Sequence, residues 1–333
     1  MDATIIIPAY NEAQTLGDGL ASLVRQAEQR RGVEIIVVDD GSTDSTPDLV
    51  RGFPGVRLLR QNQQGPAAAR NRGALEATGE IILFTDGDCI PLDNWLEEML
   101  APFQQLPDLI GIKGAYITRQ RSLTARFVQI EYEDKYDKLA TQQYIDFIDT
   151  YSAGYRRQAF LAVGGFDQEF PVACAEDVEL SYRLANLGCK LLFNPQAKVM
   201  HRHPDRIGAY LKKKFKFAYW RMLSVKKNPN KILADSHTPQ SMKVQLLLFP
   251  ALVASALSAF VAPWFFKISL TVFLLALLTT IPFVFKALQK DVLIGCLSPG
   301  FLILRSGAQF LGVTLGMLGN LWPRGSSRSR CTT

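Results

Sequence analysis

The sequence predicts an α/β fold with a mixed, mostly parallel sheet, followed by helices that cross a membrane. Two observations carry this prediction. In residues 1–205, short apolar runs alternate with helical patterns, and strands that alternate with helices form parallel sheets covered on both faces. From residue 244 to residue 285, the only charged residue is Lys267. Such a region is typical of membrane helices, since one crossing needs about 20 apolar residues.

Five short runs in the front region have the apolar character of buried strands. They cover residues 4–8, 33–39, 56–60, 80–85 and 190–200. The segments between these runs include helical patterns. Helices are expected at about 12–30, from near 45, at 66–78 and near 94–105. In such sheets ligands bind at the carboxyl ends of strands, which is where the polar motifs of this sequence lie.

The back of the chain contains three apolar regions. Residues 244–266 and 268–285 are expected to form a helical hairpin, because a very short connection joins them. The third region, 292–322, has Arg305 in its middle and is broken by the Pro-Gly pair at 299–300. Since a charge at mid-bilayer is costly, this region is either a third crossing with a functional arginine or an interfacial or re-entrant segment. We favour a third crossing.

The distribution of basic residues predicts which side of the membrane the front region occupies. Residues 202–231 contain ten Lys and Arg against one acid, Asp205, and they abut the first apolar run. No leader of charged and then apolar residues precedes the first strand. We therefore expect a multi-pass protein of the inner or plasma membrane with a cytoplasmic front region and a basic, aromatic interface segment at 206–240. The basic tail at 324–333 would also prefer the cytoplasm, which argues against an odd number of crossings.

The composition limits which binding partners are expected. The net charge of +6 is concentrated beside the predicted membrane helices. Anionic membrane lipids explain it more simply than nucleic acid does, so no nucleic-acid partner is expected. The five cysteines show neither zinc-ligand spacing nor a paired framework, which fits a reducing compartment.

Asp86 and Asp88 follow the buried run 81–84 and are separated by one glycine. Two carboxylates at the carboxyl edge of a sheet can hold Mg²⁺ or Mn²⁺, which leaves ligand positions for substrate phosphates. This pattern points to a nucleotide diphosphate held through a metal. The ordinary alternative is a polar turn after a strand, since Asp and Gly are common turn residues.

Four polar motifs occur in a specific order along the front region. They are Pro8-Ala9-Tyr10-Asn11-Glu12 after the first strand, Asp39-Asp40-Gly41-Ser42 after the second, the segment 64–71 after the third, and the paired aspartates. Together they resemble the motifs of family 2 glycosyltransferases, which have a GT-A fold built on a Rossmann-like sheet. The resemblance covers about residues 3–205 and implies that these residues form a nucleotide-sugar-dependent catalytic domain.

The resemblance implies a binding site for the nucleotide. Its implied members are Pro8, Tyr10, Glu12, Asp39, Asp40 and Arg70. Carboxylates can accept hydrogen bonds from ribose hydroxyls or a uracil N–H, and Tyr10 offers an aromatic face. Arg70 could balance the diphosphate. The alternatives are a helix first turn for Glu12, a capped turn for the aspartates and a solvated surface position for Arg70.

The resemblance also assigns a catalytic base. Glu176 and Asp177 match a Glu-Asp pair that opens a helix on the acceptor side, and Asp177 matches the base that takes the acceptor's proton. Departure of the diphosphate from the opposite face would invert the anomeric configuration. Without the family likeness, Glu176 and Asp177 would read only as acids that favour a helix amino terminus.

Further residues are expected around the sugar, the acceptor and the metal. Gly154, Gly165 and Arg183 are expected in the sugar and acceptor pocket, where small residues allow close approach. His201, at the end of the last predicted strand, fits the position of a third metal ligand. A histidine there can also serve only local hydrogen bonds.

These expectations define an inverting, metal-dependent hexosyltransferase that uses a nucleotide-diphosphate sugar, with a UDP-sugar favoured. The acceptor would be a hydroxyl of a glycan or lipid-linked glycan at the cell envelope. Residues 214–221 lack the Gln-x-x-Arg-Trp motif of processive members, and the spans are too few for a polymer channel, so single addition is favoured. Alternatives are a processive polysaccharide synthase, a sugar nucleotidyltransferase and, more remotely, an inactive membrane scaffold.

Overall fold

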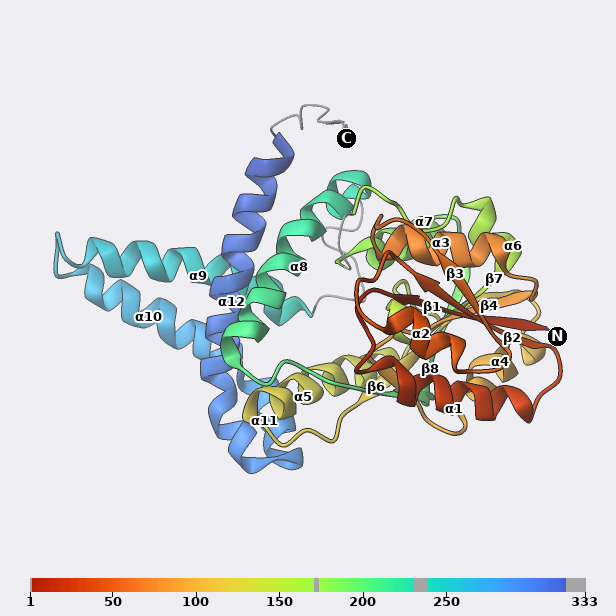
Figure 1. Cartoon of the computed structure of the whole chain (residues 1–333). Helices are drawn as coiled ribbons and strands as arrows, with labels where there is room; N and C mark the ends of the chain where they lie inside the picture. The colour runs from red at the N-terminus through yellow and green to blue at the C-terminus, as the bar shows by residue number, and fades with distance from the viewer. Residues whose placement is uncertain (1, 171–173, 230–238, 322–333) are drawn as a thin grey trace.

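The computed structural model describes residues 2–170, 174–229 and 239–321 (Figure 1). Its front region is built around one eight-stranded sheet with the strand order β3-β2-β1-β4-β7-β6-β8-β5. The strands are β1 (Ala3–Ala9), β2 (Val33–Asp39), β3 (Val56–Arg60), β4 (Ile81–Phe84), β5 (Cys89–Pro91), β6 (Leu109–Ile117), β7 (Ala153–Arg156) and β8 (Lys190–His201). All five strands expected from the sequence are present, whereas β5, β6 and β7 were not anticipated.

The sheet is mixed and mostly parallel, as predicted. Parallel pairing joins β1 to β2 and β4, β2 to β3, and β6 to β8. Strand β7 lies antiparallel to both β4 and β6, and β5 lies antiparallel to β8. The central strands are buried along most of their length; Ile5, Ile6 and Ile7 are at most 1% exposed. Such continuous apolar runs are required where helices cover both faces of a sheet.

Helices cover both faces of this sheet (Figure 1). Helices α3, α6 and α7 lie on one face, and α1 and α4 lie on the other. The helices of the front region are α1 (Leu16–Glu28), α2 (Thr46–Arg51), α3 (Pro66–Glu76), α4 (Trp95–Gln105), α5 (Leu123–Leu139), α6 (Arg157–Ala162) and α7 (Glu176–Asn186). Helix α1 begins four residues later than expected, so Glu12 lies in the loop before it, where its carbonyl accepts the backbone N–H groups of Thr15 and Leu16.

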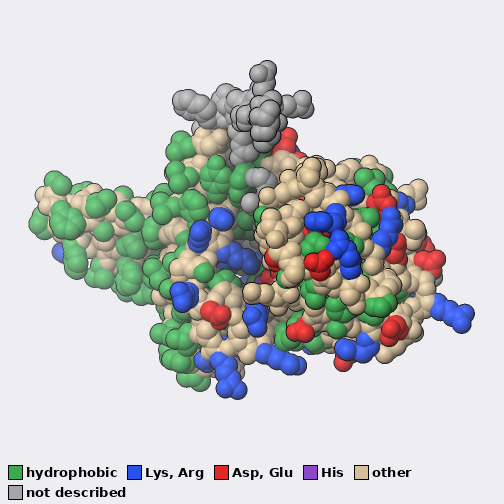
Figure 2. All heavy atoms as spheres, in the orientation of Figure 1, with side chains coloured by type: hydrophobic (Ala, Val, Ile, Leu, Met, Phe, Trp, Pro, Cys, Tyr) green, Lys and Arg blue, Asp and Glu red, His purple; other side chains and the backbone are tan. Residues whose placement is uncertain are grey.

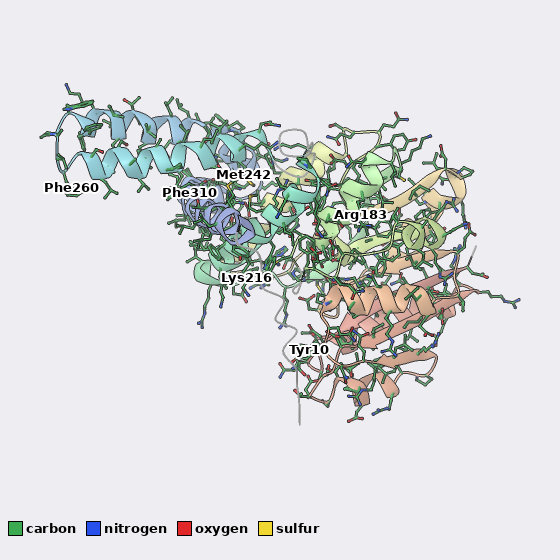
Figure 3. All side chains as sticks on the ribbon, turned by 90° about the horizontal axis from the view of Figure 1, so that it is seen from above. Tyr10, Arg183, Lys216, Met242, Phe260 and Phe310 are labelled. Carbon is green, nitrogen blue, oxygen red and sulfur yellow. The ribbon has the colours of Figure 1, made fainter. Side chains whose placement is uncertain are left out.

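The back of the chain is helical. It comprises α8 (Ile207–Lys227), α9 (Gln240–Ser258), α10 (Phe265–Leu278), α11 (Ile281–Lys290) and α12 (Val292–Leu321). Helices α9 and α10 project from the rest of the molecule as a hairpin coated with hydrophobic side chains (Figures 1 and 2). Phe260 lies at its outer end and is 90% exposed (Figure 3).

The predicted membrane segments need three corrections. The first helix runs over Gln240–Ser258 rather than 244–266, and the second region is divided into α10 and α11, which bend by 45°. The third is not broken at Pro299, because α12 continues through it. Proline lacks the N–H that would bond the carbonyl of Gly295, and the Ser298 hydroxyl donates to that carbonyl instead at 2.8 Å.

Two described helices are long and apolar enough to cross a membrane, α9 and the part of α12 from Val292 to Gly319. The bent pair of α10 and α11 would add a third if it counts as one span. This composition indicates membrane association. The number of crossings and the cytoplasmic orientation stay predictions, and the basic tail at 324–333 lies outside the described residues.

Helix α12 is also packed against the front of the chain. A buried apolar cluster joins Phe127, Val128 and Ile130 of α5 to Ala287, Ile294 and Leu302 of α11 and α12. Along α8, a side chain at Gly312 or Gly316 would collide with backbone carbonyls at 2.4 and 2.5 Å. Glycines therefore let the two helices approach closely. The back helices and the catalytic-domain segment proposed at 1–205 thus share a core.

Candidate functional site

Most of the predicted site residues converge on one cavity of about 540 Å³ beside the carboxyl ends of β1, β2 and β4. Ten of them line it: Pro8, Tyr10, Glu12, Asp40, Arg70, Asp86, Asp88, Glu176, Asp177 and His201. Parallel strands β2, β1 and β4 are adjacent, so the loops that follow them meet at one edge of the sheet. The residues at 174–177 approach from the start of α7.

Asp88, Cys89 and His201 form a cluster that could hold a metal ion. One ligand atom from each lies within 4.8 Å of the others, and Asp88 Oδ2 is 3.4 Å from His201 Nδ1. The antiparallel register of β5 and β8 pairs Cys89 with His201, which explains why residues far apart in sequence meet. Burial opposes ionisation of Asp88, but the nearby His201 lowers the pKa of Asp88 below its ordinary value.

Asp86 is engaged differently from its neighbour. Its Oδ1 accepts a hydrogen bond from the Arg70 guanidinium at 2.7 Å, and the same guanidinium donates to Glu176 Oε1 at 2.9 Å. Arg70 is only 2% exposed. It is therefore not the solvated arginine of the alternative reading; it holds together the acidic pair after β4 and the acidic pair at the start of α7.

The backbone before α7 is unusual. Ala175 is buried and has φ of +71°, a left-handed backbone conformation that residues other than glycine rarely adopt. This turn places Glu176 where it accepts the backbone N–H of Cys174 at 2.7 Å, and Asp177 where it accepts that of Val178 at 2.8 Å. Backbone strain of this kind is found most often at functional sites.

Both carboxyls at the start of α7 hold protons more tightly than usual. Burial raises the pKa of Glu176 to about 7, with a further contribution from Asp177, while Arg70 acts in the opposite direction. Burial also raises the pKa of Asp177. A carboxylate whose pKa is raised toward the working pH accepts a proton more readily, which suits a general base.

The side of the cavity expected to bind the nucleoside is formed by the loops after β1 and β2. Tyr10 lines the cavity and is 41% exposed. Asp40 lines the cavity while its carboxylate accepts the backbone N–H groups of Gln64 and Gly65 at 2.9 and 2.8 Å. Asp40 thus orders the loop before α3. Burial raises the pKa of Glu12, which also lines the cavity.

Four expected site residues do not line this cavity. Asp39 is fully buried and accepts the backbone N–H of Ser42 at 3.1 Å and the Arg60 guanidinium at 2.9 Å. A Cβ at Gly154 would meet Leu83 Cδ2 at 2.7 Å, so this glycine faces the apolar core. Both positions therefore support the fold and do not line the cavity, and their expected roles at the site stay predictions.

Gly165 and Arg183 are the other two. Gly165 has φ of +66° and packs against the Asn71 side chain, where a Cβ would lie 2.5 Å from Oδ1. Arg183 forms an ion pair with Glu179 at 2.7 Å and donates to the Gly165 carbonyl, also at 2.7 Å. Together they fix the loop between α6 and α7 instead of entering the cavity.

Several lining residues were not anticipated. They include Tyr116, Tyr132, Asp149, Lys213 and Phe217. Lys213 and Phe217 come from α8, within the predicted interface segment, where nothing in the basic run distinguishes Lys213 from its neighbours. Lys and Arg side chains gather between the front region and the membrane helices (Figure 2). Helix α8 therefore contributes directly to one wall of the site.

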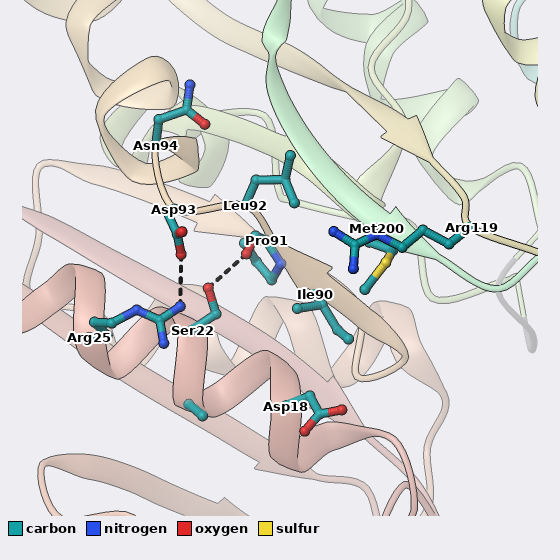
Figure 4. Close-up of a pocket in the computed structure, with 11 residues that line it drawn as sticks. Asp18, Ser22, Arg25, Ile90, Pro91, Leu92, Asp93, Asn94, Arg119 and Met200 are labelled. Carbon is teal, nitrogen blue, oxygen red and sulfur yellow. Dashed lines mark hydrogen bonds and ion pairs between the residues drawn. The ribbon is translucent and has the colours of Figure 1, made fainter.

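A second cavity of about 580 Å³ lies at the outer edge of the sheet, between α1 and β5 (Figure 4). Arg25 pairs with Asp93 at 2.7 Å there, and the Ser22 hydroxyl donates to the Pro91 carbonyl at 2.7 Å. None of the predicted catalytic, metal-binding or nucleotide-binding residues lines it. The cavity at the strand ends remains the candidate active site.

Comparison with known proteins agrees with this geometry. Residues 4–164 match the model of glycosyl transferase family 2. The glycosyltransferase AglE of Haloferax volcanii is 30% identical over 226 residues, which cover 64% of this chain and 70% of AglE. The chain belongs to glycosyl transferase family 2. This family membership agrees with the resemblance that the motifs carry.

Two further similarities bear on this family 2 glycosyltransferase. The pre-mycofactocin glycosyltransferase of Mycobacterium tuberculosis is 29% identical over 221 residues, but the match spans only 45% of that longer protein and 64% of this chain. A mannosyltransferase from Pyrobaculum calidifontis, solved with GDP-Man and Mn²⁺, has a TM-score of 0.61 at 21% identity and covers 97% of this chain and 88% of its own. The latter likeness establishes the GT-A fold.

Proposed function

We propose that this enzyme transfers a hexose from a nucleotide-diphosphate sugar, with UDP favoured, to a hydroxyl acceptor in a single addition with inversion. The observation that carries the proposal is that one cavity of about 540 Å³ is lined by both acidic pairs, Asp86 with Asp88 and Glu176 with Asp177. A cavity of this size suits a small-molecule ligand. The two pairs supply the two functions that such a transfer needs.

The first function is neutralisation of the leaving group. Asp88 and His201 would hold Mg²⁺ or Mn²⁺ together with a carboxylate oxygen of Asp86, and the bound ion would offset the charge of the departing diphosphate. Carboxylate oxygens suit both ions and an imidazole nitrogen suits Mn²⁺, whereas the Cys89 thiol is a soft ligand that neither prefers. The cluster of ligand atoms within 4.8 Å supports this assignment.

The second function is activation of the acceptor. The acceptor oxygen forms a bond to the anomeric carbon as the bond from that carbon to the diphosphate breaks, and Asp177 takes the acceptor's proton. The buried position of Asp177, which raises its pKa, favours this proton transfer. Glu176 positions the turn through Arg70 and the Cys174 backbone. Attack opposite to the leaving group inverts the configuration without a covalent intermediate.

We further propose that the acceptor is lipid-linked and that the reaction takes place on the cytoplasmic face of the membrane. Helix α8 supports this: Lys213 and Phe217 line the cavity, while Gly312 and Gly316 of α12 pack on the same helix. A lipid-anchored acceptor beside the α9–α10 hairpin would therefore lie close to the site. Pro8, Tyr10, Glu12 and Asp40 would contact the nucleoside on the opposite wall.

The decisive variant is Asp177→Asn. It should lower turnover by about two to four orders of magnitude, because a positioned base contributes that much. Binding of UDP with Mn²⁺, measured by calorimetry, should stay within about twofold. The matched control is Asp93→Asn, which removes an acid that is 85% exposed and should leave turnover unchanged.

Donor identity and stereochemistry need a panel of labelled nucleotide-sugars with membrane extract, followed by NMR of the anomeric proton in the product. An α-linked donor should give a β-linked product carrying one added sugar. Full activity of Asp177→Asn would favour a sugar nucleotidyltransferase, which needs no acceptor base. Absence of metal-dependent nucleotide binding would instead favour an inactive scaffold.

A further inference from the structure

The thiol of Cys89 has no part in the proposed reaction, although it lies against two residues assigned to the metal. Its Sγ is 3.7 Å from His201 Nδ1 and 3.7 Å from Asp88 Oδ1. Asp88 Oδ2 is 3.4 Å from the same Nδ1. One oxygen of Asp88 lies within 4.8 Å of both other ligand atoms. We call Asp88, Cys89 and His201 the thiol cluster.

The pairing of β5 with β8 holds the thiol cluster together. The antiparallel register sets Cys89 opposite His201. The next pair along the two strands, Ile90 and Met200, lines the second cavity at the outer edge of the sheet (Figure 4). Successive side chains of a strand point to opposite faces, so Cys89 and His201 share the other face. That face meets the catalytic cavity, which His201 lines.

The imidazole of His201 is fixed in place as well. Its ring stacks on the ring of Tyr116, with ring centroids 4.5 Å apart and ring planes 19° apart. Cys89 and His201 are both buried. Ligand atoms held on paired strands and by packing are placed more precisely than those on loops. Such a site loses little conformational freedom when it binds an ion.

The separations within the thiol cluster match those of a tetrahedral zinc site. Zinc binds sulfur at about 2.3 Å, nitrogen at about 2.0–2.1 Å and carboxylate oxygen at about 2.0–2.2 Å. Tetrahedral angles then place the sulfur about 3.6 Å from the other two ligand atoms, and the nitrogen about 3.4 Å from the oxygen. The observed separations are 3.7, 3.7 and 3.4 Å. They involve both carboxylate oxygens of Asp88, so a rotation of that carboxylate would bring one oxygen to the ion.

The donor chemistry agrees with the geometry. A thiolate, an imidazole nitrogen and a carboxylate oxygen are all ligands of Zn²⁺, whereas Mg²⁺ and Mn²⁺ prefer oxygen ligands to sulfur. Cys89 would bind as the thiolate and release its proton to solvent. Three protein ligands leave one position for water or a phosphate oxygen. The ordinary alternative is a buried thiol that donates a weak hydrogen bond to Asp88.

We propose that the thiol cluster binds Zn²⁺, and that this ion displaces the Mg²⁺ or Mn²⁺ of the proposed reaction. Both ions would need Asp88 and His201, so only one of them can be bound at a time. Zinc would be drawn toward Cys89, which does not line the catalytic cavity, and would keep a single open position for the diphosphate. It would therefore inhibit transfer. The displacement rests on the proposed function, whereas binding of zinc through Cys89 does not.

Binding is tested on the untagged full chain in a neutral detergent, with Co²⁺ as a spectroscopic substitute for Zn²⁺. A cobalt–thiolate bond gives a charge-transfer band in the near ultraviolet, which Cys89→Ser should abolish. The affinity of Cys89→Ser for Zn²⁺, measured by competition with a chromophoric chelator, should fall at least about tenfold. Its affinity for Mn²⁺ should stay within about threefold, because manganese has little preference for sulfur.

The matched control is Cys174→Ser. Cys174 also lines the catalytic cavity but is not a member of the thiol cluster, so this variant should keep both the band and the zinc affinity. Melting curves recorded with a chelator and no added metal check that both serine variants are folded. Displacement is followed by the electron paramagnetic resonance signal of Mn²⁺. Zinc should release bound Mn²⁺ from the unmodified chain at a lower concentration than from Cys89→Ser.

The zinc site is overturned if Cys89→Ser keeps the band and the zinc affinity, or if Cys174→Ser loses them to the same extent. The displacement is overturned if Mn²⁺ stays bound when Zn²⁺ binds. None of these readouts measures turnover, so they are independent of the test of glycosyl transfer. Full activity of Asp177→Asn would overturn the proposed reaction and leave the zinc site standing.

Discussion

Arg70 connects two acidic pairs that would otherwise repel each other across the active site. Its guanidinium reaches Asp86 at 2.7 Å and Glu176 at 2.9 Å, and almost none of it contacts water. A buried charge that loses its partner is strongly destabilising, although the pair itself adds little net stability. Arg70 therefore matters most for the geometry of the site.

The first prediction follows from this geometry. Replacing Arg70 by Ala should lower the free energy of unfolding by roughly 3–5 kcal/mol, because two carboxylates are left without their buried partner. Arg70→Lys should retain part of the stability but lose activity, since one ammonium cannot reproduce a planar fork. Denaturant titration and turnover measurements check both; Arg72→Ala, on the same helix but outside the cavity, is the control.

An unchanged unfolding free energy in Arg70→Ala would show that the carboxylates do not depend on the guanidinium. Loss of stability without loss of activity in Arg70→Lys would limit Arg70 to a role in the fold.

Among individual residues, the sequence predicted the acidic residues that line the cavity better than the small ones. Asp86, Asp88 and Asp177 could be placed because strand ends and a helix start bring polar side chains to one edge of the sheet. Gly154 could not, because a glycine facing an apolar core and one facing a substrate look alike in sequence. The metal ligand assignments and the role of Asp177 stay predictions.

Among the elements, the start of α7 has a strained backbone. Ala175 has φ of +71°, which costs an alanine about 1 kcal/mol relative to a glycine. Such a conformation persists only where the surrounding structure holds it, and here it presents Glu176 and Asp177 to the cavity.

A second prediction concerns this residue. Ala175→Gly should raise the free energy of unfolding, by up to about 1 kcal/mol, because glycine adopts the left-handed conformation without strain. Ala175→Val should lower it, and should lower kcat more than it changes donor affinity, because the turn that positions Asp177 would shift. Thermal unfolding and steady-state kinetics give the two readouts.

If Ala175→Gly were instead as destabilising as Ala175→Val, the left-handed backbone at this residue would be in doubt. Equal loss of donor affinity in both variants would place the turn on the donor side of the cavity.

Elements of the front region were predictable where the apolar run was continuous. Residues 33–39 match β2, because such a run leaves few alternatives to a buried strand. The helices at the back of the chain were harder to predict. Pro299 suggested a break, but α12 continues through it, and the hydroxyl of the adjacent Ser298 bonds the freed carbonyl of Gly295.

Across the whole molecule, Glu131 joins the front region to the membrane helices. It lies on α5 and accepts hydrogen bonds from Tyr210 of α8 and Arg305 of α12, with Lys214 3.1 Å away. Burial alone would raise the pKa of Glu131, but Lys214 and Arg305 outweigh it and lower the pKa from 4.5 to about 2.

The pH dependence of stability follows with a definite sign. Because folding lowers the pKa of Glu131, its stabilising contribution is complete above pH 4.5 and is lost as the pH falls toward about 2. Glu131→Gln should therefore melt at a lower temperature than the unmodified chain at neutral pH, with the difference shrinking below pH 4.5. Melting curves of the detergent-solubilised full chain, recorded from neutral pH down to about pH 2, check this pH dependence.

A constant difference across that range would show that the carboxylate does not titrate in the folded protein. Glu133→Gln, which removes an acid paired with Lys290 on the outer side of α5, serves as the control and should leave the acid limb unchanged.

The apolar cluster of Phe127, Val128 and Ile130 with Ala287, Ile294 and Leu302 has a practical consequence. Truncating the chain after residue 205 would not give a water-soluble protein. Truncation would expose the aromatic and aliphatic side chains of α5, and an exposed apolar surface of this kind promotes aggregation. The region proposed to be catalytic and the helices proposed to anchor it in the membrane would therefore depend on each other for folding.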